Sequence, residues 1–272
     1  MYYLKKVVTC PAEGECRETV LQDAVGDEDA ALWITDSSSR GRELLEEGKA
    51  VLIWLHEGNR SQDFSAFRYA CDNPAELDRD YLEGVYRRFR GIPWDILETD
   101  RCLVRETTVA DVEEFYRIYK EPSITDFMEP LYDDPQKERT YARDYIDKVY
   151  SFYGFGIWTV LAKTQNTQDM SDKEDESEVI GRAGICYREG YEDPEIGFLI
   201  AVDKQGQGYA SEVCRAIMQY GHEELGFERI LAFVRPANQA SLKVCEKLGM
   251  SRIGQTQLQE VDYVILSHEK SS

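Results

Sequence analysis

The chain has 272 residues and a net charge of −20, with 42% hydrophobic and 31% charged residues, so it is long enough for one large or two ordinary globular domains. This acidity argues against a nucleic-acid partner, because phosphate backbones are bound by clustered Lys and Arg. No apolar run approaches the roughly 18 residues that span a membrane, and no signal-peptide core follows the first residues, so we expect a cytoplasmic protein.

The seven cysteines are odd in number and include no C-x-x-C pair, and the three histidines are isolated. We therefore expect reduced thiols and no metal site. The acidity itself has two interpretations: a preference for cationic substrates such as amines, or a surface property that favours solubility.

The first part of the chain predicts a small parallel domain, because strand-like and helix-like patterns alternate along it. Strands are expected over 2–9, 31–35, 51–55 and 93–97, and helices over 18–24, 42–47 and 74–90. We place this small α/β, Rossmann-like domain at 1–98 and assign it no role from the sequence.

One segment of this domain has two interpretations. Residues 35–41 are rich in N-cap side chains and follow a predicted strand. They lie at the sheet edge where open α/β sheets bind ligands. The segment therefore predicts either a simple helix cap or a phosphate or nucleotide site.

Residues 99–101 mark the junction to a second domain, expected over 99–272. A strand over 102–108 and a helix over 109–118 open it, with Arg105, Asp111 and Ile118 at a regular spacing. Further strands are expected over 155–162, 179–185 and 193–198, with closing strands near 253 and over 261–267. The polar stretch 164–178 predicts a mobile hairpin loop.

The central feature of the second domain is a glycine-spaced loop between an apolar strand, 196–202, and a helical pattern that begins near Ala210. Gly206 and Gly208 let the backbone turn so that successive N–H groups point into one concavity. The helix dipole and the unpaired N–H groups of the first turn make such a concavity an anion site, best suited to phosphate. Taken alone, the spacing is also compatible with a glycine-rich helix cap.

A second pattern follows from Asn238, and it identifies a family. The loop fits the motif Q/R-x-x-G-x-G/A, and the later stretch fits N-x-x-S-x-x-V-x-x-K-L-G-F/M. The matching residues are Gln205, Gly208 and Ala210, followed by Ser211 and Glu212, and then Asn238, Ser241, Val244, Lys247, Leu248, Gly249 and Met250. Together, 179–254 resembles the core of the GNAT superfamily of acyl-CoA-dependent N-acyltransferases. The spacing of Arg105, Asp111 and Ile118 is typical of its RimJ/RimL-like branch.

The resemblance implies a GNAT mixed-sheet domain with acetyl-CoA as co-substrate and no metal. The strand edge at Leu199, Ile200 and Val202 would pair with the pantetheine amides. The backbone of the loop would hold the diphosphate through Gln205, Gly206, Gln207, Gly208, Tyr209 and Ala210. Asn238 and Ser241 would lie beside the pantetheine arm.

The resemblance also implies catalytic roles for three residues. Glu195, at the head of the central strand, is either a general base or a structural cap. Asn238 and Ser241 can donate hydrogen bonds to the developing thiolate. Cys245 stands where many relatives have a general-acid tyrosine, and it is expected to pack in the core rather than act as an acid.

In the family, the region 123–153 lines the acceptor side of the cleft. Tyr132, Tyr141 and Tyr145 are therefore either acceptor contacts or core residues. We predict an N-acetyltransferase that acts on a primary amine, either a protein N-terminus or a small amine. The alternative is an acyl-CoA-binding sensor without turnover. Expected partners are acetyl-CoA and the acceptor, with a homodimer left open, and neither nucleic acid nor membrane.

Overall fold

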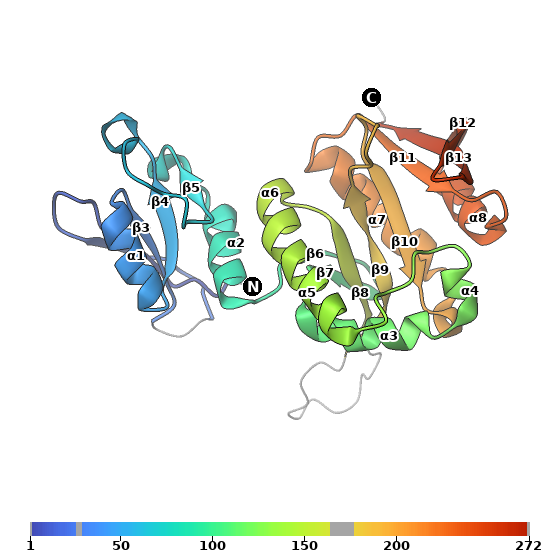
Figure 1. Ribbon diagram of the computed structural model, residues 1–272, viewed down its shortest axis with the longest axis horizontal. Coiled ribbons are helices and arrows are strands. Elements are labelled where there is room, and N and C mark those ends of the chain that lie inside the picture. The colour runs from blue at the N-terminus through green and yellow to red at the C-terminus, as the bar shows by residue number, and fades with distance from the viewer. Residues whose placement is uncertain (1, 26–28, 164–176, 271–272) are drawn as a thin grey trace. The chain divides into compact units, whose positions relative to one another are not determined.

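The computed structural model describes residues 2–25, 29–163 and 177–270. The chain divides into two compact units, Met1–Trp94 and Asp95–Ser272, each built on its own sheet (Figure 1). The loop predicted at 164–178 falls outside the described residues from 164 to 176.

The first unit has a five-stranded sheet in the order β2-β1-β3-β4-β5. Its elements are β1 (Lys6–Thr9), β2 (Arg17–Val20), β3 (Ala31–Thr35), α1 (Ser38–Glu46), β4 (Ala50–Trp54), β5 (Ala70–Cys71) and α2 (Arg79–Arg90). β1, β3, β4 and β5 run parallel, which confirms the predicted parallel arrangement. β2 stands where a helix was expected over 18–24, and that prediction was wrong. All four of its residues are exposed, so only the antiparallel backbone pairing with β1 defines it.

The two helices of this unit cover opposite faces of the sheet. Leu82 and Val85 of α2 belong to one buried cluster with Leu52 of β4, whereas Leu44 of α1 packs with Val51 and its neighbours on the other face. A strand that is buried on both faces needs apolar residues at every position, which explains the continuous apolar run in β4.

Cys10 and Cys16 form a disulfide, which corrects the expectation that every cysteine is reduced. Thr9 pairs with Arg17 at the end of the β1–β2 hairpin, so the next residues on each side are brought together. The other five cysteines are free thiols.

The second unit has an eight-stranded mixed sheet in the order β12-β13-β11-β10-β9-β8-β7-β6. The strands are β6 (Asp95–Glu98), β7 (Cys102–Arg105), β8 (Ile157–Ala162), β9 (Glu178–Cys186), β10 (Glu195–Ile200), β11 (Arg229–Val234), β12 (Ser251–Leu258) and β13 (Val261–Glu269). Only β10 and β11 are parallel neighbours. The mixed sheet expected for this part of the chain is confirmed.

β6 is the strand that the sequence placed at the end of the first domain. It pairs with β7 instead, because Ile96 and Leu97 pack against the core of the second unit. The division between the units therefore falls after Trp94, whereas the sequence placed it after residue 98.

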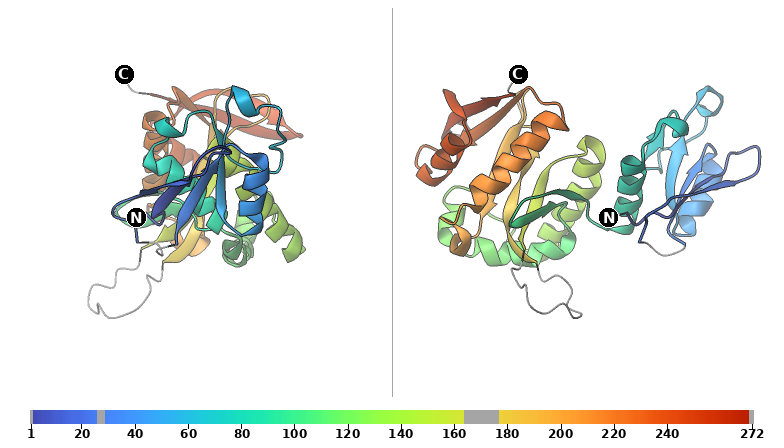
Figure 2. Two further views of the ribbon diagram at one scale, coloured as in Figure 1. Left: turned by 90° about the vertical axis from the view of Figure 1, so that its left-hand side faces the viewer. Right: turned by 180° about the vertical axis from the view of Figure 1, so that it is seen from behind.

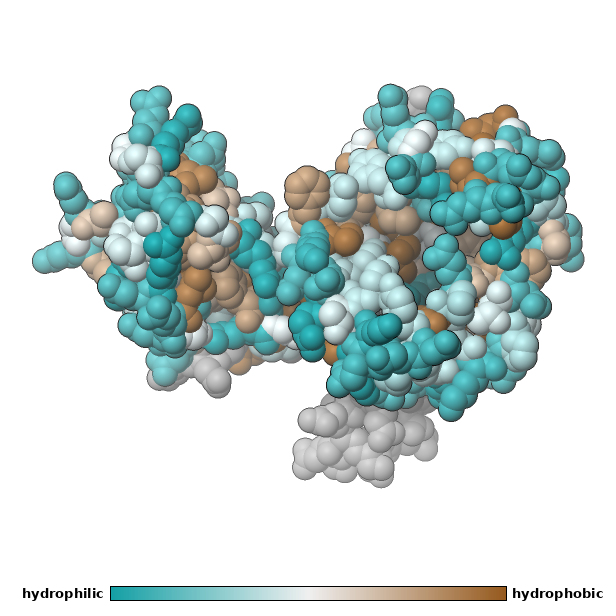
Figure 3. Space-filling view, in the orientation of Figure 1, coloured by the Kyte–Doolittle hydropathy of each residue, from teal (hydrophilic) through white to brown (hydrophobic). Residues whose placement is uncertain are grey.

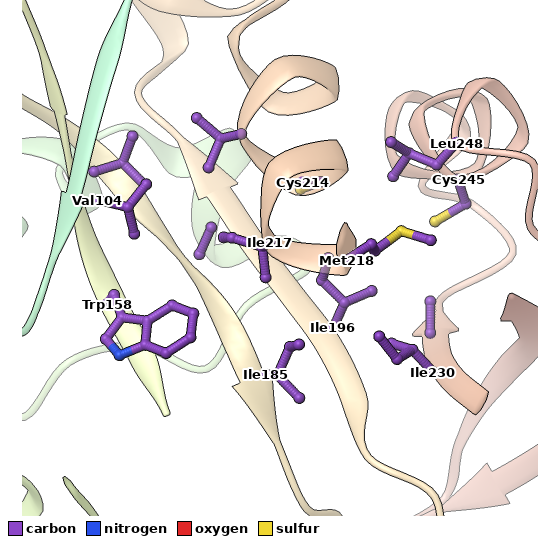
Figure 4. Packing of buried hydrophobic residues seen from close by; sticks show 14 of the residues in the cluster. Val104, Trp158, Ile185, Ile196, Cys214, Ile217, Met218, Ile230, Cys245 and Leu248 are labelled. Carbon is purple, nitrogen blue, oxygen red and sulfur yellow. The ribbon is translucent and has the colours of Figure 1, made fainter. Parts of the chain in front are cut away.

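Helices cover both faces of this sheet. α3 (Val112–Tyr119), α4 (Pro122–Thr125) and α5 (Pro135–Tyr145) lie on one face, and a π-helical turn (Ile146–Tyr150) and α6 (Ser151–Tyr153) continue α5. α7 (Tyr209–Glu223) crosses the opposite face, as the rear view shows (Figure 2). The main core lies under α7 and α8 (Gln239–Lys247), where Trp158, Ile185 and Ile217 are fully buried (Figure 4).

Candidate functional site

The loop between β10 and α7 has the geometry of an anion cradle. Gly206 and Gly208 have φ angles of 74° and 90°, and Gly208 is the N-cap of α7. Among the described residues, the N–H groups from Gly206 to Ser211 have no hydrogen-bond partner. Unpaired N–H groups at the N-terminus of a helix favour an anionic guest.

Side chains hold the rest of this loop in place. The Nε2 of Gln205 donates to the carbonyl of Ile200 at 2.9 Å, and the Nε2 of Gln207 donates to the carbonyl of Asp203 at 2.8 Å. A Cβ at Gly208 would lie 3.5 Å from Nη2 of Arg101, which is an ordinary contact. The need for glycine here therefore comes from its left-handed φ.

The strands β10 and β11 diverge immediately after they meet. Their only register pair is Glu195 with Leu231. From Ile196 to Ile200, the edge of β10 that faces β11 has no strand partner among the described residues. This edge includes the predicted Leu199 and Ile200, of which the carbonyl of Ile200 already accepts from Nε2 of Gln205, whereas Val202 lies in a 3₁₀ turn.

The helices that follow these two strands begin at the same end of the sheet. α7 follows β10 and α8 follows β11, and the carboxyl ends of parallel strands are where α/β sheets bind ligands. The topology therefore places the glycine loop and Asn238 at the same end of the sheet.

Asn238 is the N-cap of α8, and its Oδ1 accepts a hydrogen bond from the N–H of Ser241 at 3.0 Å. The structure thus brings these two predicted residues together. Within the described parts of the chain, neither the side-chain amide nitrogen of Asn238 nor the hydroxyl of Ser241 makes a hydrogen bond. Both groups therefore remain available as donors to a ligand.

Cys245 lies on the inner face of α8 and is fully buried beside Cys214 and Met218 (Figure 4). Burial raises the pKa of its thiol to about 11. The thiol therefore packs in the core, as the sequence predicted.

Glu195 is 8% exposed and is held by Arg188. Oε2 accepts from Nε of Arg188 at 2.9 Å, and Oε1 lies 2.8 Å from its Nη2. The guanidinium group lies 4.9 Å from the ring of Phe233. Cys186 lies opposite Glu195 on β9, and burial, with Glu195 as a further cause, raises the pKa of its thiol to about 12.

Sequence analysis did not identify Arg188. The signal was the β9–β10 hairpin, in which Cys186 pairs with Glu195, so that Arg188 follows just beyond the paired end. That signal becomes usable only when the register is known.

The sheet surface beside Glu195 is bare. Side chains alternate along a strand, so Glu195, Gly197 and Leu199 share one face, and Leu199 packs there with the α3 residue Phe115. Among the described residues, only Cδ1 of Ile157 comes within 4 Å of a Cβ built on Gly197, at 3.6 Å. This face is turned to the viewer in Figure 3, where the second unit is hollowed in its middle.

Tyrosines form one wall beside this face. Tyr132 packs edge-on against Tyr141, which contacts Tyr145, which contacts Tyr150. The hydroxyl of Tyr145 accepts from the N–H of Ile157 at 2.8 Å, and that of Tyr150 donates to the carbonyl of the same residue at 2.6 Å. Burial raises the pKa of Tyr145 to about 12. Tyr132 and Tyr141 are half exposed.

The segment 35–41 of the first unit forms the N-cap of α1 through Ser37, as one of its two interpretations predicted. Oγ of Ser37 accepts from the N–H of Arg40, and Oε1 of Gln62 accepts from the N–H of Ser38 at 2.7 Å. Two of the N–H groups in the first turn of α1, those of Ser38 and Arg40, are therefore bonded within the protein.

Over the described ranges, no group of three or more His, Cys, Asp or Glu side chains could hold a metal ion. Within the same ranges, no helix is long and apolar enough to cross a bilayer.

Comparisons with known proteins identify the arrangement of the second unit. A family model described as "Acetyltransferase (GNAT) domain" matches residues 101–251, more than half of the chain. YoaA of Bacillus subtilis strain 168, described as an uncharacterized N-acetyltransferase, is 28% identical over 165 residues, which are 58% of this chain and 84% of the relative.

Solved structures agree in fold. A GNAT-family acetyltransferase from Bacillus anthracis matches with a TM-score of 0.51 and 21% identity, over 64% of this chain and 97% of that protein. RimL, described as a ribosomal L7/L12 α-N-protein acetyltransferase, matches with a TM-score of 0.52 and 16% identity, over 65% and 95%. At these identities the likeness shows the fold alone, and it does not distinguish the RimJ/RimL-like branch.

Proposed function

The chain belongs to the GNAT acetyltransferase family, and on that premise we propose that it transfers an acetyl group from acetyl-CoA to a primary amine. The observation that carries the proposal is the row of unpaired N–H groups from Gly206 to Ser211, beside a strand edge that its parallel neighbour leaves free. A diphosphate needs the unpaired N–H groups. The amide groups of a pantetheine arm need the strand edge as a hydrogen-bonding partner.

Bound acetyl-CoA supplies the thioester, whose acetyl carbon exchanges its sulfur for the acceptor nitrogen. In this proposal Gln205, Gly206, Gln207, Gly208, Tyr209 and Ala210 hold the diphosphate, and the backbone of Leu199, Ile200 and Val202 orients the pantetheine arm. Asn238 and Ser241 donate hydrogen bonds to the departing thiolate, whose charge such donors stabilise. Their free amide and hydroxyl groups at the start of α8 support this role.

Glu195 faces the acceptor side, where it receives a proton from the amine or orients it. Both of its carboxylate oxygens already contact Arg188, so the guanidinium group fixes the direction in which the remaining lone pairs point. The bare surface at Gly197 and the wall of tyrosines leave room for an acceptor next to this carboxylate.

We place the chain in the RimJ/RimL-like branch on its two motifs. The ion pair of Arg105 with Asp111, at 2.7 Å, gives a physical reason for the spacing of these two residues in that branch. We propose either a protein N-terminus or a small amine as the acceptor. We also propose a cytoplasmic location, which the five free thiols favour, although the Cys10–Cys16 disulfide does not. The proposed function is also compatible with a homodimer.

The experiment is turnover of acetyl-CoA against a panel of primary amines and N-terminal peptides, followed by the release of free thiol, for the full chain and for Glu195→Gln. Amine-dependent thiol release supports the enzyme, and a lower rate for the variant supports the role of Glu195. Tight binding of acetyl-CoA without release on any acceptor supports the alternative, an acyl-CoA sensor in which Cys245 replaces the acid. If the chain neither binds acetyl-CoA nor releases free thiol with any acceptor, the proposal is refuted.

A further inference from the structure

The turn between β6 and β7 reaches the cofactor loop through the side chain of Arg101. Nη1 of Arg101 donates to the carbonyl of Gln207 at 3.1 Å. Its guanidinium group lies 4.2 Å from the ring centre of Tyr209, and Nη2 lies 3.5 Å from the position of a Cβ on Gly208. Arg101 thus contacts Gln207 and Tyr209, on either side of Gly208, although it lies outside both sequence motifs.

Glu212, in the first turn of α7, holds this arginine in place. Its Oε2 accepts from Nε at 2.7 Å and lies 2.6 Å from Nη2. Its Oε1 accepts from the Arg101 N–H at 3.0 Å and from the hydroxyl of Thr99 at 2.6 Å. Burial alone would raise the pKa of Glu212, but the hydrogen bonds from Thr99 and Arg101 hold it below its usual value. The pair is therefore charged near neutral pH, and the two contacts of Nε and Nη2 with one carboxylate oxygen fix the guanidinium plane.

The bond to Gln207 has a consequence on the other side of the same peptide group. The carbonyl of Gln207 and the N–H of Gly208 point in opposite directions, because the peptide bond between them is trans. While Arg101 holds the carbonyl, the N–H of Gly208 faces away from Arg101. If this peptide flipped, a carbonyl oxygen would replace that donor, and it would repel an anion.

We propose that Arg101 is a positioning residue of the cofactor site, which keeps the 207–208 peptide turned so that its N–H meets the diphosphate. The inference rests on the proposed function, since it concerns the binding of the same donor. Among the described residues, the side chain of Arg101 contacts Glu212, Gln207 and Tyr209 but not Glu195, Asn238 or Ser241, so its effect should be confined to the diphosphate end of the donor.

The test compares two thioesters with one accepted amine: acetyl-CoA, and S-acetylpantetheine, which lacks the diphosphate and the nucleoside. For Arg101→Met we expect the KM for acetyl-CoA to rise about 10-fold or more, the usual scale for losing a charge-assisted hydrogen bond. The kcat on acetyl-CoA and both constants on S-acetylpantetheine should stay within about twofold of the full-chain wild type. The inhibition constant of ADP, a probe that carries the diphosphate and the adenosine but no pantetheine arm, should rise with that KM.

Two variants separate positioning from direct contact. Glu212→Gln should weaken acetyl-CoA in the same direction, because the guanidinium loses its anchor; if the charge of Arg101 bound the diphosphate itself, freeing it from Glu212 would leave binding equal or tighter. Arg252→Met, which removes an exposed arginine paired with Glu246, is the matched control and should change nothing.

Provided that the wild type is active, two results for Arg101→Met overturn the inference. One is an equal loss of activity on both thioesters, and the other is an unchanged KM for acetyl-CoA. Tighter binding in Glu212→Gln also overturns it. A wild type that turns over neither thioester overturns the proposed function itself. Arg101→Lys keeps the charge without the fork, so it should show part of the loss even if Arg101→Met is too unstable to assay.

Discussion

A single methyl group at Gly208 tests whether the loop after β10 binds the donor. Gly208 has a φ of 90°, where a side chain costs about 1 to 2 kcal/mol. An added Cβ would make only an ordinary contact with Arg101, at 3.5 Å, so the backbone term decides the outcome. By the scaling for domains of this size, Gly208→Ala should lower the melting temperature by about 2 to 8 °C. A loop that relaxes instead would turn its N–H groups out of the cradle.

The matched control is Gly226→Ala. Gly226 has a φ of 73°, with no atom within 4 Å of a Cβ, and it lies between α7 and β11 rather than in the cradle. The free-energy cost of Gly226→Ala should therefore be similar to that of Gly208→Ala, and the substitution should not change the binding of acetyl-CoA.

The assay is thermal melting with and without acetyl-CoA. At a hundred times its dissociation constant, the ligand should add roughly 2.7 kcal/mol, or about 5 to 11 °C. The wild type and Gly226→Ala should both show this shift, and Gly208→Ala should lose most of it. If both variants melt lower and both keep the full shift, Gly208 is a helix cap only, and the assignment of the loop is refuted.

Three further predictions concern the second unit. A fragment of residues 95–272 should be soluble and bind acetyl-CoA in a melting assay, whereas 100–272, which lacks β6, should melt lower; equal melting would show that β6 adds nothing to this sheet. Ser241→Ala should lower kcat by roughly 5- to 150-fold, the range for a lost bond to a charged group, and Cys245→Ala should leave it nearly unchanged; the reverse order in steady-state rates would invert the two roles. Burial raises the pKa of Asp111, but its bonds to a guanidinium group, to a backbone N–H and to a hydroxyl hold that pKa below its usual value. Its contribution to folding stability is therefore present above pH about 4 and is lost as the pH falls through the lowered pKa. Urea unfolding at pH 7 and pH 3 should show Asp111→Asn to be less stable than the wild type at pH 7 and less sensitive to acid, and an equal pH dependence of the two proteins would contradict this.

Features that depend on local chemistry were predictable from the sequence. Gly206 and Gly208 supply conformations that other residues avoid, and Asn238 caps a helix with its own side chain. Such effects act over three or four residues, so their residue types alone predict the loop, the helix that follows it and the start of α8. The likeness to a family then supplied the roles of these residues.

Features that depend on pairing across long stretches of chain were not predictable. The sequence shows that 93–97 favours a strand, but not which sheet offers it a partner, and β6 pairs in the second. Arg188 reaches Glu195 only through the register of one hairpin, and Arg101 reaches Gln207 across 106 positions. These contacts follow from the assembled sheet, where no single segment carries a signal for them.

The π-helical turn at Ile146–Tyr150 gives the tyrosine wall a property that an α-helix lacks. Residues five apart on an α-helix stand about 140° apart around the axis, whereas a π turn brings them nearly into line. The hydroxyls of Tyr145 and Tyr150 can therefore hydrogen-bond to the N–H and the carbonyl of the same residue, Ile157. Losing one residue between them would rotate one tyrosine away by about 100° and open the wall. The outline of the tyrosine wall therefore depends on the length of this helix. An insertion or deletion would change that outline, whereas the exchange of either tyrosine for another residue would not.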